Sequence, residues 1–455
     1  MRTRIAAISL LIALSLPAMA LAAPARLDEL ARAALQGSPE AIAGLRAAGP
    51  AGMEAMLAVV CPGGTCPGPS AEGSPLDRVC GVRDCADLQL FWYTDLEAAK
   101  AAARESGKPI LSLRLMGKLD EEMSCANSRF FRTVFYKNSE INRMLRERFV
   151  LHWRSVRPVP RVTIDFGDGT RLERTLTGNS IHYVLDSRGR LVEGLPGLYG
   201  PQAFRASLER AERAARQASN LADASLAAWL SLRFERELKE RGKAAELDYE
   251  AAKPRPKPRP VPVAAAPAMD GPRDPWKILG ESVVLEDGKI PSLSTLETGA
   301  KRTAEWTVLD ALFGVSDDDL RLLGKARAAH VALDPSSRAF LLRKHGITDP
   351  DEAERLVKSF EESVALDEVI NEYRTGPAIL KRLKEPETWK GFDLEAFNLW
   401  VYEEVFRTPL SDPWLGLAPG DVFTALPPST RTAGAATPEA RSTAPSASAP
   451  RPPGR

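Results

Sequence analysis

Cysteines are the residues of this 455-residue chain whose type and spacing could do chemistry. Four of the five fall into two pairs with the same spacing, Cys61 with Cys66 and Cys80 with Cys85. In an oxidising compartment such thiols tend to form disulfides, and four cysteines allow three pairings between which the sequence does not choose. A zinc site is less favoured, because the spacing is wider than in a C-x-x-C knuckle and the nearest histidine is far along the chain. Cys125 is left without a partner.

Cys125 lies in the stretch SCANSRFF, residues 124–131, where an acidic loop gives way to an expected helix. Unpaired backbone N–H groups and the helix dipole stabilise a thiolate at the first turn of a helix, which is how reactive cysteines are commonly made. A free cysteine is also among the most buried residue types, where it acts as a small hydrophobic side chain. The sequence therefore leaves two interpretations of Cys125, a working thiol and a packed one.

The residues on either side of Cys125 extend this pattern. ESGKPILSLRL (105–115) leads into SCANSRFFRTVFYKNSEINRMLRERFVLHW (124–153), and IHYVLDSRGRLVEGLPGLYGPQAFRASL (181–208) follows. This succession resembles the thioredoxin superfamily, specifically exported thioredoxin-like domains, in which a helix and GKP lead into a strand before a C-x-x-C at a helix start. The last stretch resembles the final hairpin and terminal helix of that fold.

The resemblance implies an α/β domain with Cys125 at the nucleophilic position and Ser128 at the resolving position. Because the motif is C-A-N-S, it cannot close an internal disulfide, and the implied chemistry is a mixed disulfide with an exported protein or a small thiol. The Ser128 hydroxyl would then donate a hydrogen bond to the thiolate. Ser180 stands where the fold has a proline that faces the cysteines, and nearby His182 is a candidate supporting residue. The alternative is a non-catalytic interaction scaffold built on a degenerate thioredoxin fold.

The first residues of the chain predict export. The stretch MRTRIAAISLLIALSLPAMALAAPA combines two arginines with a short apolar run and small-residue cleavage sites. The apolar run is shorter than the roughly 20 residues that span a bilayer. We therefore expect a signal peptide over residues 1–22 and a periplasmic or secreted protein with no membrane span in the mature chain.

Charge and motifs argue against several other functions. The formal net charge is +1, from 61 basic and 60 acidic residues, so no excess of charge favours a nucleic-acid partner. No G-x-S-x-G, Walker or H-E-x-x-H pattern occurs, so hydrolase, nucleotide-binding and metalloprotease functions lack a motif. We predict neither a cofactor nor a metal.

Hydrophobic spacing predicts the elements that would position these residues. Short buried or alternating runs predict strands over 109–115, 149–156, 162–166, 170–176, 181–185 and 190–194. Helical spacing predicts helices over 125–135, 139–148, 201–214, 303–313, 317–329, 336–345, 350–372 and 394–406. Between residues 109 and 214 the predicted strands alternate with predicted helices, which indicates an α/β domain.

Composition divides the rest of the chain. A Pro-rich basic stretch and an end rich in Pro, Ala, Ser and Thr enclose a region of helical periodicity. The predicted segments are a signal peptide (1–22), a helical, Cys-containing N-terminal segment (23–85), the thioredoxin-like domain (86–218), a helical extension (219–252), a Pro-rich linker (253–273), a separate all-helical domain (274–426) and a disordered tail (427–455).

Overall fold

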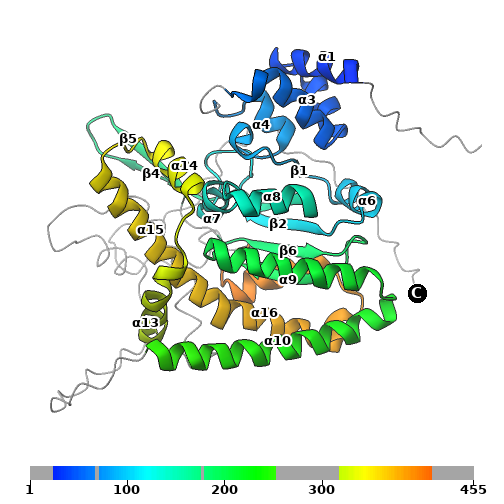
Figure 1. Ribbon diagram of the computed structural model, residues 1–455, viewed down its shortest axis with the longest axis vertical. Coiled ribbons are helices and arrows are strands. Elements are labelled where there is room, and N and C mark those ends of the chain that lie inside the picture. The colour runs from blue at the N-terminus through cyan, green and yellow to red at the C-terminus, as the bar shows by residue number, and fades with distance from the viewer. Residues whose placement is uncertain (1–23, 67–70, 176–178, 253–316, 412–455) are drawn as a thin grey trace, which may run out of the picture.

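The central element of the computed structural model is a five-stranded mixed sheet (Figure 1). The structure describes residues 24–66, 71–175, 179–252 and 317–411. The strand order is β1-β3-β2-β6-β7, in which β1, β3 and β2 are parallel, β6 is antiparallel to β2, and β7 is antiparallel to β6. The strands are β1 (Trp92–Tyr93), β2 (Ile110–Met116), β3 (Val150–Arg157), β6 (Ile181–Leu185) and β7 (Leu191–Pro196). The predicted α/β class is therefore confirmed.

The central strand β2 is buried along its whole length. Its sequence ILSLRLM fits this place, because a strand covered on both faces needs apolar side chains on both. Successive side chains point to opposite faces, so Leu111, Leu113 and Leu115 share one face while Ser112 and Arg114 share the other. Two polar residues in the middle of a buried strand require partners on that second face.

The first face of the sheet is covered by the helices that follow β2 and β7. These are α7 (Ala126–Phe130), the π-helical turn η2 (Phe131–Phe135), α8 (Ser139–Arg148) and α9 (Pro201–Ser219). His182 lies opposite Leu113 in the strand register, and its ring contacts those of Phe131 and Phe204. Phe204 also stacks on Phe135, with ring centroids 4.0 Å apart. This aromatic layer joins η2 and α9 to the sheet.

The second face is covered by helices from both ends of the described chain. They are α6 (Leu96–Ser106), α16 (Gly376–Leu383) and α17 (Leu394–Trp400). Glu395 of α17 forms an ion pair of 2.7 Å with the fully buried guanidinium of Arg114. Between β3 and β6 the described chain forms the hairpin β4 (Arg161–Asp165) and β5 (Arg171–Thr175) rather than a helix. Because this connection contributes no helix to the second face, α16 and α17 cover it together with α6.

The polar residues on the second face form one hydrogen-bonded network. Arg114 Nη1 donates to Ser112 Oγ at 2.6 Å, and Ser112 Oγ lies 2.8 Å from His152 Nδ1. Burial, together with the charge of Arg114, lowers the pKa of His152 to about 3, so this imidazole is neutral near pH 7. Arg114, Ser112 and His152 thus form one hydrogen-bonded chain, and Glu395 supplies the balancing charge. Arg114 Nε and His152 Nε2 are buried without a hydrogen-bond partner among the described residues.

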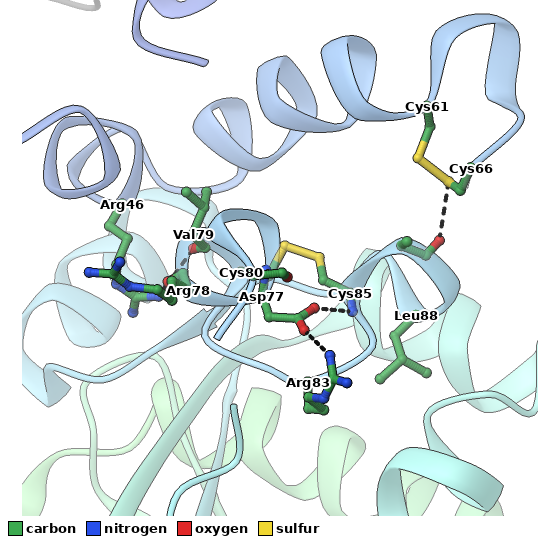
Figure 2. Close-up of a disulfide and its surroundings, with 12 residues drawn as sticks. Arg46, Cys61, Cys66, Asp77, Arg78, Val79, Cys80, Arg83, Cys85 and Leu88 are labelled. Atoms are coloured by element: carbon green, nitrogen blue, oxygen red, sulfur yellow. Dashed lines mark hydrogen bonds and ion pairs between the residues drawn. A yellow bond between two sulfur atoms is a disulfide. The ribbon is translucent and has the colours of Figure 1, made fainter. Parts of the chain in front are cut away.

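The N-terminal segment is a group of short helices held by two disulfides. The helices are α1 (Pro24–Leu35), α2 (Pro39–Ala47), α3 (Pro50–Val60), α4 (Pro75–Cys80) and α5 (Cys85–Leu88). Of the three pairings that the sequence allows, the structure has the one in which both disulfides are local, Cys61–Cys66 and Cys80–Cys85 (Figure 2). The Cys80–Cys85 pair is fully buried and joins the end of α4 to the start of α5.

Two side chains attach the Cys80–Cys85 loop to the sheet. Arg46 of α2 donates to the carbonyl of Val79 and to the carbonyl of Trp92, at 3.1 Å each. Trp153 of β3 donates its indole N–H to the carbonyl of Gly81 at 2.7 Å. Gly81 has a φ of 69°, and a Cβ here would lie 2.6 Å from the carbonyl oxygen of Trp92. The turn inside the disulfide therefore needs glycine at this position.

The C-terminal helices extend the core of the sheet. They include α10 (Asp223–Ala252), α13 (Asp317–Arg327), α14 (Pro335–His345) and α15 (Pro350–Ile370). The sequence predicts a separate helical domain, and the described helices α13, α14, α15 and α17 (Leu394–Trp400) lie where it expects helices, whereas it does not predict α16. They do not stand apart, however, because Val364, Ile379, Phe397 and Tyr402 belong to the same buried hydrophobic cluster as the strands. An amphipathic stripe shows that a helix buries one face but not what it packs against.

Several sequence predictions lie outside the described residues. They are the signal peptide (1–22), the Pro-rich linker (253–273), the helix predicted over 303–313 and the tail (427–455). Among the residues that are described, no helix combines the length and the apolar character needed to cross a bilayer.

The two disulfides are expected to differ in their contribution to stability. Each closes a short loop, for which chain entropy gives about 2 kcal/mol. Replacing Cys80 and Cys85 by alanine also removes buried sulfur atoms from the core, so we expect this double variant to lose more unfolding free energy than the variant with alanine at 61 and 66. Urea unfolding followed by circular dichroism measures both, and equal losses would contradict the difference in burial.

Candidate functional site around Cys125

Cys125 is the residue that begins helix α7. Its own backbone is extended, with φ −60° and ψ 156°, and its carbonyl accepts the N–H of Arg129 at 3.2 Å. The N–H of Cys125 donates to the carbonyl of Met116 at the end of β2, also at 3.2 Å. The predicted position at a helix start, after the loop that follows β2, is therefore confirmed. The side chain itself is fully buried.

The structure brings Ser128 to the thiol. The distance between Cys125 Sγ and Ser128 Oγ is 3.5 Å. Two oxygens lie nearer to the Ser128 hydroxyl, Ser124 Oγ at 2.7 Å and the carbonyl of Cys125 at 2.8 Å. Because Ser128 has one hydroxyl proton and these oxygens accept it, the sulfur is left to donate to Ser128 rather than to receive a hydrogen bond from it.

A buried arginine lies one turn beyond Ser128. The Arg132 side chain is fully buried, and its Nη2 donates to Ser124 Oγ at 3.3 Å and to the carbonyl of Glu122 at 3.4 Å. Its Nη1 lies 3.7 Å from the Asp84 carboxylate and 3.9 Å from that of Glu122. Burial lowers the pKa of Arg132, and these carboxylates oppose that effect. The positive charge of Arg132 is therefore stabilised by Asp84 from the Cys80–Cys85 loop and by Glu122 from the loop before Cys125.

Two further cations complete this charge cluster. Arg83, inside the Cys80–Cys85 loop, pairs with Asp77 at 2.5 Å (Figure 2). It also pairs with Glu122 at 3.2 Å. Lys344 of α14 pairs with Asp84 at 2.8 Å and with Glu122 at 3.2 Å. Burial raises the pKa of Glu122, but the charges of Arg132, Lys344 and Arg83 outweigh it and hold this pKa below its ordinary value. The loop before Cys125 is thus fixed by the disulfide loop and by a C-terminal helix.

His182 does not pair with Cys125 in the part of the chain described. Its Nε2 lies 2.8 Å from Tyr136 Oη, and its ring lies in the aromatic layer under the sheet. Burial lowers the pKa of His182 to about 3, so the ring is neutral near pH 7. The same burial raises the pKa of Tyr136 well above its ordinary value. His182 and Tyr136 therefore form a neutral hydrogen-bonded pair.

Ser180 lies in the segment that enters β6, and that segment is covered by C-terminal residues. Ser180 is fully buried, and its Oγ has no hydrogen-bond partner among the described residues. The preceding residue, Asn179, accepts the hydroxyl of Tyr402 at 2.9 Å through its carbonyl. Its side-chain amide donates to Thr408 Oγ1 at 3.3 Å. The segment that contains Ser180, where the resemblance expects a proline that faces the cysteines, is thus covered by C-terminal residues of this chain.

Helices α14 and α15 cover the turns that follow Cys125. Ser337 donates its hydroxyl to the carbonyl of Val134, and Ser336 to the carbonyl of Lys137, both at 2.9 Å. The rings of Phe130 and Phe360 stack with centroids 5.3 Å apart and an interplanar angle of 18°. Hydrogen bonds and an aromatic stack therefore hold these helices on the helix that carries the thiol.

Sequence reasoning found the thiol but missed the charges around it. Arg132 follows Ser128 by four residues, which places both on one face of a helix, and this spacing is the signal that could have found it. Nothing in the sequence near Asp84 or Lys344 indicates that they meet at Glu122.

Among the described residues, no group of three or more His, Cys, Asp or Glu side chains is placed to hold a metal ion. Comparisons with protein-family models, curated proteins and solved structures found no match for this chain.

Removing the Arg132 guanidinium is expected to destabilise the protein strongly. Arg132→Met would leave Glu122 and Asp84 short of a partner in a buried site, which costs about 3 kcal/mol. Adding Glu122→Gln should recover part of this loss, because one of the two carboxylates that lost a cation is removed as well. Urea unfolding of both variants measures the difference, with Arg143→Met, on an exposed side chain of α8, as the control. A loss within 0.5 kcal/mol of that control, roughly the range of surface substitutions, would contradict the cluster.

The buried neutral His182 is expected to make stability depend on pH. Its pKa is about 3 in the folded protein and about 6.5 in an unfolded chain, so between these values only the unfolded state takes up the proton. Stability should therefore fall as the pH decreases from about 6.5, by about 1.4 kcal/mol per unit from this residue. His182→Gln should remove this part of the slope, and His330→Gln, on an exposed ring, should not. Unfolding free energies at several pH values test this, and parallel slopes for all three proteins would contradict it.

Proposed function

We propose that this protein is an exported, non-catalytic interaction scaffold whose central region is a thioredoxin-like domain. The succession of elements supports the fold: helix α6, strand β2, the helix that Cys125 begins, strand β3, the hairpin of β6 and β7, and the terminal helix α9. This succession follows the stretches on which the resemblance was based. The two disulfides support a periplasmic or secreted location, since such bonds persist in oxidising compartments.

The complete burial of Cys125 carries the proposal. A thiol exchanges with a disulfide only when its sulfur reaches the partner's sulfur, and here 0% of the cysteine is exposed. The helix that Cys125 begins is itself covered, because α14 and α15 are hydrogen-bonded and stacked over the turns that follow Cys125. A helix start that would favour a reactive cysteine in an open site is here part of a packed core.

The C-terminal helices are joined to the thioredoxin-like region by ion pairs. Glu395 and Lys344 bind charges that belong to the sheet and to the loop before Cys125. The thioredoxin-like region therefore serves as the support on which the N-terminal and C-terminal helices are assembled, and the exposed helices offer surface to a partner.

A second candidate function is monothiol exchange through Cys125. The contact between Cys125 and Ser128 favours it, because the two occupy the positions of the nucleophilic and resolving cysteines. In this reaction the Cys125 thiolate attacks a disulfide of an exported protein or a small disulfide. One mixed S–S bond forms, the old S–S bond breaks, and the partner's other sulfur leaves as a thiolate. The reaction requires the Cys125 sulfur, which is fully buried here, to become exposed to the partner.

Alkylation of the native protein distinguishes the two functions. With the other four cysteines in disulfides, iodoacetamide can label only Cys125. The scaffold predicts that labelling proceeds at the rate of unfolding and accelerates with urea. A positive control is the variant Cys125→Ala with Lys243→Cys, which moves the thiol to an exposed position of α10.

Rapid labelling of the native wild-type protein, matching this control, would reject the scaffold and favour exchange. In that case Cys125→Ser should abolish mixed disulfides with exported proteins, which non-reducing electrophoresis after acid trapping detects.

A further inference from the structure

Helix α9 lies on the sheet next to β6 and β7, and helix α10, which follows it in the chain, runs along the lower edge of the molecule (Figure 1). They enclose a groove of about 390 Å³. Its lining includes Arg210 and Arg213 from α9, together with Trp229, Leu232 and Arg236 from α10. The groove lies on different elements from those that contact Cys125, so it is independent of the thiol.

The groove carries an excess of positive charge. Four arginines line it against two glutamates, Glu237 and Glu240. Glu237 is already held by Arg233 and Arg241 in ion pairs. Arg213 and Arg236 are exposed, and no carboxylate of the described residues lies within ion-pair distance of either. These guanidinium groups are therefore available to carboxylates from outside.

Apolar side chains lie among these arginines. Leu232 is 65% exposed, which is high for a large aliphatic residue, and Trp229 is half-buried beside it. A free anion would gain nothing from these two residues, whereas a peptide with both carboxylates and apolar side chains can use all of them. Amphipathic helices commonly bind in grooves of this kind, with their apolar side chains directed inward.

We infer that the groove between α9 and α10 docks an acidic amphipathic segment of a partner protein. Its carboxylates pair with Arg213 and Arg236, and its aliphatic or aromatic side chains lie against Trp229 and Leu232. The inference gives the proposed scaffold a class of partner and in that respect rests on it. Its test does not use the reactivity of Cys125, so failure of the groove and failure of the scaffold are distinguishable.

The test measures binding of a defined peptide to the full chain. The probe is a fluorescein-labelled helical peptide with Leu at i, i+3 and i+4 spacing and Glu on the flanking positions, followed by fluorescence anisotropy. We expect saturable binding that weakens with added salt, since exposed ion pairs are screened. The double variant Arg213→Glu with Arg236→Glu should weaken it by about tenfold or more, which corresponds to about 1.4 kcal/mol.

Two controls separate docking from general charge attraction. Lys243→Glu changes an exposed cation of α10 that does not line the groove, and it should bind the peptide as the wild type does. Leu232→Ser should weaken binding severalfold without changing charge. The inference is overturned if the peptide does not bind, if a Gln-for-Glu peptide binds equally, if Lys243→Glu weakens binding as much as the double variant, or if Leu232→Ser has no effect.

Discussion

A guanidinium removed from water must be met by carboxylates, and this protein contains two fully buried ones near the centre of the sheet region, Arg114 and Arg132. Arg114 lies in the central strand and is balanced by Glu395 of α17 at 2.7 Å. Arg132 lies on the helix after Cys125 and is balanced by Asp84 and Glu122. Glu395 comes from a C-terminal helix, and Asp84 comes from the N-terminal disulfide loop. The charges of the two arginines are therefore balanced only when both of these segments are packed in place.

The same requirement explains why Cys125 is enclosed. The loop before it is held by the disulfide loop and by Lys344, and the turns after it are held by α14 and α15. These contacts are made by charged, polar and aromatic groups together, so the cover is continuous with the core rather than laid on its surface. In this setting the Ser128 hydroxyl bonds to Ser124 and to the carbonyl of Cys125 and so helps to hold the helix start. These contacts favour a structural role for the C-A-N-S motif over a catalytic one.

Much of the fold could be predicted from local sequence patterns. The buried run of β2, the hairpin about Asp186 to Gly189, the cap of α8 at Asn138 and the helix that starts at Cys125 each depend on neighbouring residues. The charge cluster could not be predicted in this way. Glu122 meets Lys344 across 222 residues of sequence, and hydrophobic spacing shows which face of a helix is buried but not which distant charge it approaches. For the same reason the C-terminal helices were predictable as helices and their place on the sheet was not.

The ion pair between Arg114 and Glu395 also sets an order of events for the newly made chain. The two residues are separated by 281 positions, so a chain that grows from its N-terminus carries the cationic central strand long before its anionic partner exists. Closing a contact of this length is slow, because the entropy of the intervening chain must be given up first. Packing of α17 on the sheet is therefore a late step of folding, which follows synthesis of the C-terminal helices, and until then the Arg114 guanidinium lacks its balancing carboxylate.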